Sequence, residues 1–183
     1  MKKSFLNTDV VFCKKCVESN QRFVSSIQHL DNSKSHKSRT NFNDDNICNA
    51  CLYFEKKSKI DWEKREKELI KICDKYRKND GNYDVLIPGS GGKDSVWVSH
   101  IMKHKFKMNP LTVTWAPHMY TEIGWKNFQN WVHSGFDNYL FTPNPTIHRK
   151  LTRLAFENLL HPFQPFAMGQ TYFPVKIAVE RNI

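Results

Sequence analysis

The sequence predicts an α/β protein with a doubly wound parallel sheet, preceded by a small module that binds zinc through cysteines. Two observations predict this class. Short apolar runs alternate with amphipathic segments of helical length across residues 83–183, as in a parallel sheet with crossover helices. Four cysteines in two close pairs lie upstream, in a polar stretch that is poor in core residues. The expected division is therefore 1–60 for the zinc module, 61–82 for a connecting amphipathic helix and 83–183 for the α/β domain.

The cysteine pairs are Cys13-x-x-Cys16 and Cys48-x-x-Cys51. No secretion signal precedes them, because polar residues interrupt the apolar candidate near the N-terminus, so zinc binding is favoured over disulfides. Four thiolates would close a tetrahedral structural site that has no open position for a substrate. A redox-active CxxC pair and four unrelated thiols are the alternatives. Two histidines in the long loop between the pairs are alternative ligands: His29 and His36.

A packing helix is predicted over residues 61–77, since apolar residues recur there at helical spacing and charged residues cover much of the other side. Cys73 lies on the apolar side, which favours a small buried hydrophobe over a nucleophile. The polar turn at residues 79–82 ends this helix and admits a strand.

A glycine-rich turn follows the apolar run at residues 85–87 and precedes a helix that should begin near Asp94. Glycines free the backbone to expose N–H groups, and a helix N-terminus faces the same point, so the turn is predicted to hold phosphate. It is not a Walker A loop, because Ile87 stands where the first glycine belongs and Asp94 follows the lysine. The alternative is a glycine-rich surface turn without a ligand. The six residues of the turn are Ser90, Gly91, Gly92, Lys93, Asp94 and Ser95.

Beyond this turn the sequence predicts alternating helices and strands. The expected helices are 94–104, 122–133, 146–160 and 172–180, and the expected strands are 111–115, 139–141 and 166–168. Gly169 and Gln170 should open the last helix, where its N-terminus could hold another phosphate or a sugar. A doubly wound sheet continues with a strand after such a helix, so we expect a C-terminally truncated domain.

Composition and charge narrow the classes of partner. The 183 residues are 39% hydrophobic with a net charge of +10, which excludes general disorder and favours an anionic partner. The lysines are spread along the chain rather than gathered with aromatics, which does not favour nucleic acid. No apolar run approaches membrane-spanning length, so we expect a cytoplasmic protein with no membrane partner.

The motif Ser-Gly-Gly-Lys-Asp-Ser resembles the signature of the PP-loop ATP pyrophosphatases, which cleave ATP between its α and β phosphates. Nearly the whole chain is similar to the N-acetyl sugar amidotransferases of that superfamily, which act in bacterial lipopolysaccharide and surface-polysaccharide biosynthesis. The likeness rests on the order of the cysteine pairs and the glycine turn, and on the segments 60–62, 109–115, 135–138, 148–153 and 161–166. Family members are longer, so the resemblance implies an N-terminal fragment with an adenine nucleotide alpha hydrolase-like fold.

The resemblance also implies a reaction and its cofactors. The acetamido oxygen of a nucleotide-linked sugar would attack the α-phosphate of ATP, and ammonia would then displace AMP to leave an acetamidine. Lys93 and Asp94 would be catalytic, with Asp94 placing Mg²⁺ unless it only caps the helix. Thr114 and Trp115 end a strand where adenine or ribose would bind, and a buried strand-end tryptophan without a ligand is the alternative for Trp115. The expected cofactors are ATP, Mg²⁺ and Zn²⁺. Further polar candidates near the same loops are His118, Tyr120, His148, Arg149, Arg153, His161 and Gln164.

Nothing in the sequence resembles a glutaminase, so the resemblance implies that glutaminase and cyclase-like subunits supply ammonia. The main alternative to an amidotransferase is a PP-loop enzyme that thiolates tRNA and carries a zinc module, although no cysteine follows Cys73 to carry sulfur. A non-catalytic zinc-containing partner module is the third possibility.

Overall fold

The computed structural model describes residues 9–23 and 39–183 and divides the chain into two compact units, Met1–Lys64 and Arg65–Ile183. The boundary falls inside the helix that was expected to connect two domains, so most of that helix belongs to the second unit. His29 and His36 lie outside the described residues.

The first unit is built from short antiparallel pairings and one helix. Isolated bridges join Phe12 to Ser19 and Phe42 to Cys48. Cys48 is the N-cap of helix α1 (Asn49–Ser58), which ends with Lys56 and Lys57 in its last turn, where cations are favoured by the helix dipole. The sequence interpretation had no helix at this place.

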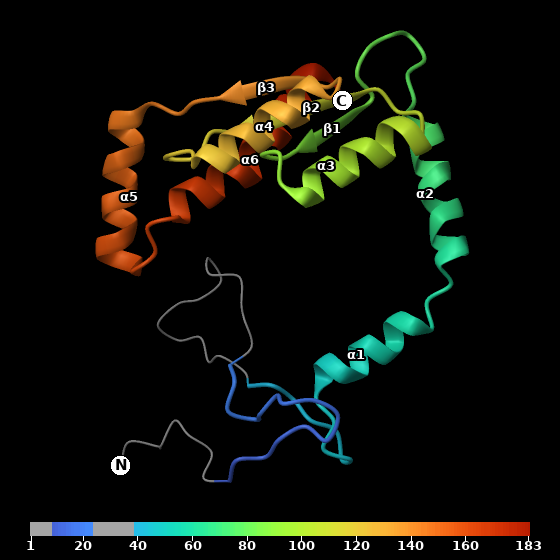
Figure 1. Ribbon diagram of the computed structural model, residues 1–183, viewed down its shortest axis with the longest axis vertical. Helices are drawn as coiled ribbons and strands as arrows, with labels where there is room; N and C mark the ends of the chain where they lie inside the picture. Colours follow the sequence, from blue (N-terminus) through green and yellow to red (C-terminus); the bar gives the residue numbers. More distant parts are fainter. Residues whose placement is uncertain (1–8, 24–38) are drawn as a thin grey trace. The chain divides into compact units, whose positions relative to one another are not determined.

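The second unit contains a three-stranded parallel sheet in the order β1-β2-β3. The strands are β1 (Val85–Pro88), β2 (Pro110–Trp115) and β3 (Asp137–Phe141) (Figure 1). Leu86 of β1 pairs with Leu111 of β2, and Val113 of β2 pairs with Tyr139 of β3. Central strand β2 is buried along almost its whole length, as expected of a parallel strand covered on both faces. The predicted strands are confirmed here, with the third beginning two residues earlier than expected.

Helices follow each strand and cover the sheet. Helix α6 packs against β1 and β2, where Ile177 joins Leu111 and Val113 in one core cluster. A second cluster lies between Phe128 and Trp131 of α4 and Phe136, which precedes β3. The helices of this unit are α2 (Trp62–Tyr76), α3 (Lys93–His100) with its π-helical continuation η2 (Ile101–Lys105), α4 (Glu122–His133), α5 (Pro145–Leu159) and α6 (Gln164–Arg181).

The predicted strand at residues 166–168 is wrong, because these residues lie within α6. A short apolar run fits a buried strand and a buried helix equally well, and the proline after Gln164 marks the helical alternative because proline fits the first turn of a helix. Gly169 and Gln170 consequently lie inside α6 rather than at its N-terminus, so the predicted helix-end site at these residues is wrong as well.

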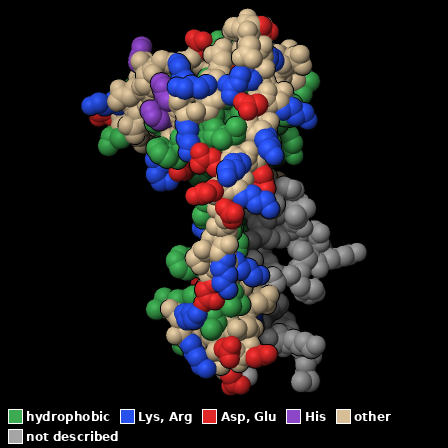
Figure 2. Space-filling model, turned by 90° about the vertical axis from the view of Figure 1, so that its right-hand side faces the viewer, with side chains coloured by type: hydrophobic (Ala, Val, Ile, Leu, Met, Phe, Trp, Pro, Cys, Tyr) green, Lys and Arg blue, Asp and Glu red, His purple; other side chains and the backbone are tan. Residues whose placement is uncertain are grey.

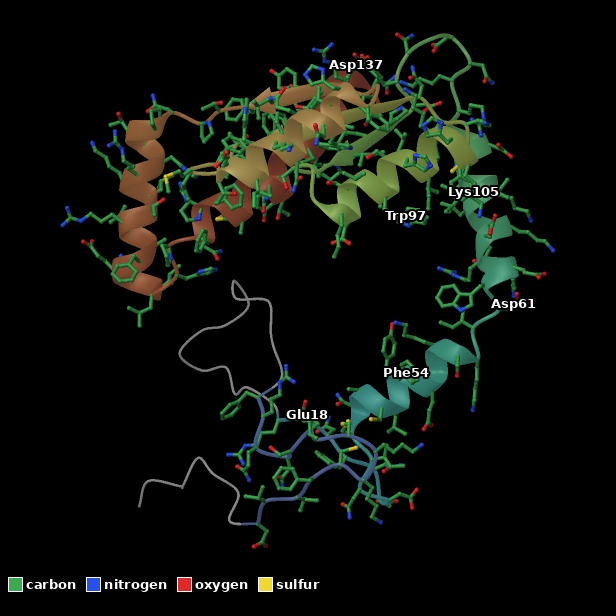
Figure 3. The ribbon with its side chains drawn as sticks, viewed as in Figure 1. Glu18, Phe54, Asp61, Trp97, Lys105 and Asp137 are labelled. Carbon is green, nitrogen blue, oxygen red and sulfur yellow. The ribbon has the colours of Figure 1, made fainter. Side chains whose placement is uncertain are left out.

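Helix α2 packs against the rest of the second unit through an apolar cluster and an ion pair. Cys73 is 2% exposed and packs with Phe106 and Met108, which confirms its role as a small buried hydrophobe. Lys105, labelled in Figure 3, forms an ion pair at 2.8 Å with Glu66 of α2. The burial raises the pKa of the Cys73 thiol and keeps it protonated.

Charged residues are mixed over one face of the protein. On the face drawn in Figure 2, lysine and arginine side chains are interspersed with acidic ones rather than gathered into one basic patch. Among the described residues, no helix combines the length and apolar character needed to span a membrane.

Candidate functional site

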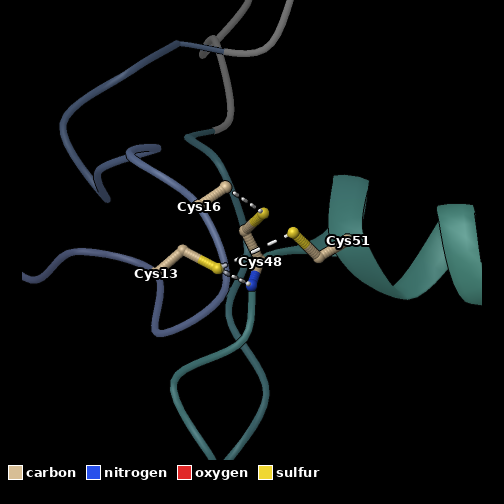
Figure 4. A group of neighbouring side chains, drawn as sticks. All are labelled: Cys13, Cys16, Cys48 and Cys51. Carbon is tan, nitrogen blue, oxygen red and sulfur yellow. Dashed lines mark hydrogen bonds between the residues drawn. The ribbon is translucent and has the colours of Figure 1, made fainter.

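Four cysteines of the first unit form a compact cluster (Figure 4). Their sulfur atoms all lie within 4.8 Å of one another, with Cys13 Sγ 3.9 Å from Cys51 Sγ and Cys16 Sγ 3.6 Å from Cys48 Sγ. A tetrahedron of thiolates about 2.3 Å from a zinc ion has edges of about 3.8 Å. The spacing therefore fits zinc, and none of the chain's five cysteines is in a disulfide. The predicted clustering of the two pairs is confirmed.

Backbone N–H groups donate to two of the four sulfur atoms. The N–H groups of Lys15 and Cys48 donate to Cys13 Sγ at 3.4 and 3.3 Å, and that of Glu18 donates to Cys16 Sγ at 3.5 Å. Burial acts to raise the pKa of the Cys13 thiol, but the backbone donors outweigh it and lower this pKa to about 6. The neighbouring Cys16 thiol, followed by burial, raises the pKa of Cys51 to about 12. Four thiolates at this spacing repel one another, so closing the site fully requires a metal cation.

The glycine turn lies in the second unit, at the carboxyl end of β1 and the start of α3 (Figure 1). Gly91 has φ +81°, a left-handed conformation, and its backbone packs so tightly that an added Cβ would lie 2.7 Å from the Cα of Phe128. Gly92 caps α3 from an extended conformation. Glycine is thus required at position 91 by both conformation and space.

Four backbone donors of the turn have no hydrogen-bond partner in the part of the chain that the structure describes. The backbone N–H groups of Gly91, Gly92, Lys93 and Asp94 donate no hydrogen bond within the described residues. Lys93 Nζ lies 2.8 Å from Asp94 Oδ1, and both side chains are 88% exposed. An exposed ion pair of this kind contributes little to stability, so either side chain can turn to a bound phosphate or metal at small cost. Asp94 does not cap the helix, because the N-cap residue is Gly92.

A small hollow of about 200 Å³ adjoins the turn at the carboxyl ends of β1 and β2. Its wall includes Ser90, Trp115 and Gln170, so residues predicted on three separate segments meet there. Thr114 differs from them, because it is fully buried and its hydroxyl accepts from Asn138 Nδ2 at 3.1 Å inside the sheet. The side chain of Thr114 is thus committed to strand pairing.

Glycine is needed at position 169 for a packing reason that the sequence did not reveal. A Cβ at this position would overlap the indole ring of Trp115, so glycine allows α6 to close against the end of β2. The interpretation of Gly169 as a phosphate-binding helix start is therefore replaced by a packing contact.

A larger cavity of about 620 Å³ lies between α5, α6 and the ends of β2 and β3. Its wall is mainly apolar and includes Trp115, Phe141 and Met168, together with His148. Sequence reasoning named His148 only as a polar residue near a loop. Its burial at 7% exposed follows from the helical spacing that places it on the inner face of α5 with Ala155.

A neighbouring hollow of about 470 Å³ shares Pro143 and His148 with this cavity. It is more polar and is lined by His118 and Arg149 among others. The rings of His118 and His148 lie 4.3 Å apart between centroids. Burial, and secondarily repulsion from His118, lowers the pKa of His148 and favours its neutral form.

No family model matches the chain. MJ1599, an uncharacterized protein of Methanocaldococcus jannaschii, is 39% identical over 82 residues, which cover 43% of this chain. The chain spans 29% of the length of that relative. The similarity thus supplies no activity for this chain, and its function has to be inferred from the geometry of its sites.

Proposed function

We propose that residues 90–95 hold the phosphates of ATP and that the chain is the ATP-binding part of a PP-loop amidotransferase acting on a nucleotide-linked N-acetyl sugar, in the synthesis of lipopolysaccharide or a related surface glycan. The observation that carries this proposal is the row of unpaired N–H groups from Gly91 to Asp94 at the end of a parallel strand and the start of a helix. A parallel α/β sheet binds ligands at this edge. ATP and nucleotide sugars are cytoplasmic metabolites, so the protein would act in the cytoplasm.

The proposed reaction activates a poor electrophile. The acetamido oxygen attacks the α-phosphorus of ATP, the bond to the β-phosphate oxygen breaks, and pyrophosphate leaves. Ammonia then adds to the imidate carbon, the carbon–oxygen bond to AMP breaks, and loss of a proton leaves the acetamidino group. The backbone N–H groups of the turn and Lys93 would stabilise the negative charge on the departing pyrophosphate.

The metals would have separate tasks. Mg²⁺ takes few protein ligands and keeps several waters, and the exposed carboxylate of Asp94 beside the turn suits such a site. Zinc would be structural, because four cysteine ligands leave no open coordination position. Its work would be to fold the first unit, whose described residues contain few buried apolar side chains.

Formation of AMP tests the proposal. The chain, in its longest natural form, is incubated with ATP, Mg²⁺, ammonium and a panel of nucleotide-linked N-acetyl sugars, and AMP and pyrophosphate are measured together. Lys93→Ala should abolish AMP formation, whereas Lys71→Ala, which removes an exposed lysine of α2, should leave it unchanged. Equal turnover in both variants would remove Lys93 from the mechanism, and absence of ATP binding in the parent protein would favour a non-catalytic zinc module.

Ammonia would come from glutaminase and cyclase-like partner subunits, since the chain carries no sequence resembling a glutaminase. The chain alone should use ammonium and ignore glutamine. Glutamine-dependent turnover without a partner would contradict this division of labour.

Thiolation of tRNA fits the geometry less well. Such an enzyme needs a reactive thiol near the ATP site, yet Cys73 is packed in an apolar cluster with a raised pKa and the other cysteines cluster together in the first unit. Salt-sensitive binding of tRNA would nevertheless restore this alternative.

A further inference from the structure

Two buried ring nitrogens, carried by residues that line the larger cavity, have no hydrogen-bond partner within the described residues. They are Nε1 of Trp115 and Nε2 of His148, and the two rings meet edge to face with centroids 6.2 Å apart. Buried polar atoms without partners are rare in folded proteins because each costs free energy. Two of them on residues that line one cavity point to a ligand with polar groups.

The chemistry of these atoms narrows the ligand. The indole Nε1–H can only donate, while a neutral imidazole nitrogen either donates or accepts according to its tautomer. A hydroxyl group both donates and accepts, so neighbouring hydroxyls satisfy both nitrogens in either tautomer. The remaining wall is apolar and aromatic, with Phe141 and Met168 available to the carbon faces of a ring.

The adjoining hollow adds a charge requirement. Arg149 and His118 line it, and it shares Pro143 and His148 with the cavity. Arginine is the side chain best suited to bind phosphate oxygens in pairs. No acidic residue lines either space within the described residues. The pair of spaces therefore fits an elongated molecule with a hydroxyl-rich ring at one end and phosphate next to it.

We propose that the cavity between α5 and α6 is the binding site of the nucleotide-linked sugar, with the sugar ring against Trp115 and His148 and the diphosphate at Arg149 and His118. This inference rests on the proposed function for the identity of the ligand. Trp115 lines both this cavity and the hollow beside the glycine turn. The sugar would thus lie next to the ATP phosphates, which a direct attack on the α-phosphorus requires.

Binding is measured by calorimetry on the full chain with UDP-N-acetylglucosamine as the probe, in the absence of ATP. Arg149→Ala should weaken binding about 10- to 100-fold, the usual effect of losing hydrogen bonds to a charged group. Lys150→Ala is the matched control, because Lys150 is the next residue of α5, is exposed and lines neither space. It should bind the probe as the parent does.

A second variant tests the apolar cavity proposed to hold the sugar ring, without removing a charged side chain. Met168→Trp places a larger ring at the cavity wall at a position that is 49% exposed, so the fold should accommodate it. It should reduce affinity for UDP-N-acetylglucosamine at least tenfold and leave affinity for uridine diphosphate nearly unchanged. If Met168→Trp binds UDP-N-acetylglucosamine as tightly as the parent protein does, the proposed position of the sugar is wrong.

The outcomes separate this inference from the proposed function. ATP-dependent AMP formation that is unaffected by Arg149→Ala and Met168→Trp would leave the function standing and overturn the site. If the protein never binds ATP but binds the probe in a way that depends on Arg149, the site stands and the proposed function is overturned. If Arg149→Ala weakens binding of ATP instead of the probe, the cavity belongs to the ATP site and the inference is wrong.

Discussion

Nε1 of Trp131 donates a hydrogen bond to Oγ of Ser99 over 2.8 Å, and both residues are buried. The Ser99 hydroxyl in turn donates to the backbone carbonyl of Ser95, the last residue of the glycine turn. Helix α4 is thereby joined to α3 directly behind the turn. This junction lies next to the N–H groups at positions 91–94, so we expect it to help hold the turn in place.

Replacing Trp131 with phenylalanine removes the donor while keeping an aromatic ring. The Ser99 oxygen then loses a buried partner, and we expect the free energy of unfolding to fall by about 1–3 kcal/mol. Urea unfolding checks this value. Trp125→Phe is the control on the same helix, because Trp125 is 44% exposed and its indole N–H makes no hydrogen bond within the described residues. Similar losses in both variants would show that the hydrogen bond contributes nothing specific.

Gly91→Ala should damage the turn far more than Gly92→Ala. An alanine at position 91 takes up a left-handed conformation and presses against the Phe128 backbone, which should cost more than about 2 kcal/mol. Position 92 has φ −73° and open space around it, so alanine fits there. Gly81→Ala isolates conformational strain, since Gly81 has φ +83° without any close neighbour. Among the three variants, we expect Gly92→Ala to have the highest melting temperature, Gly81→Ala an intermediate one and Gly91→Ala the lowest.

The protein should contain about one zinc ion per chain, held by the four clustered cysteines. Cys16→Ser should remove the metal, whereas Cys73→Ala should retain it because Cys73 lies in a separate apolar cluster. Metal content and the unfolding of the first unit on addition of a chelator are the measurements. A chain that stays folded throughout without any metal would refute the structural role.

Acid should destabilise the protein in part through His148. Its pKa is lowered below the ordinary 6.5 by burial and then by His118, so below that pH the unfolded chain binds a proton that the folded chain does not. Stability should therefore be steady above about pH 7 and fall as the pH drops below about 6.5. His148→Gln should flatten this fall in urea unfolding between about pH 8 and about pH 5.5. His133→Gln, at an exposed histidine of α4, should retain it.

Sequence patterns predicted most of the second unit. Strand β2 is a short run of apolar and β-branched residues that is buried almost throughout, and helix α4 buries one clear face. The close pairing of cysteines was sufficient to predict their cluster. The segment 166–168 was not, because three apolar residues carry no period of their own. Helix α1 was also missed, since it has no buried residue to mark an inner face.

The candidate site was predictable only where neighbours in sequence act together. The glycine turn is one continuous segment, and its strand-to-helix context is sufficient to place it. Trp115 and His148 belong to different elements, and only the fold brings their rings together. The reason for Gly169 was hidden for the same cause, because the indole that excludes a side chain there comes from β2.

His148 and Pro143 form a wall common to the two spaces beside α5. A compound that fills both has to extend past this wall, whereas a short one reaches the polar groups on one side only. Among compounds of equal charge, binding would consequently favour those long enough to contact both spaces, so the separation of the two spaces would set the preferred length of the ligand.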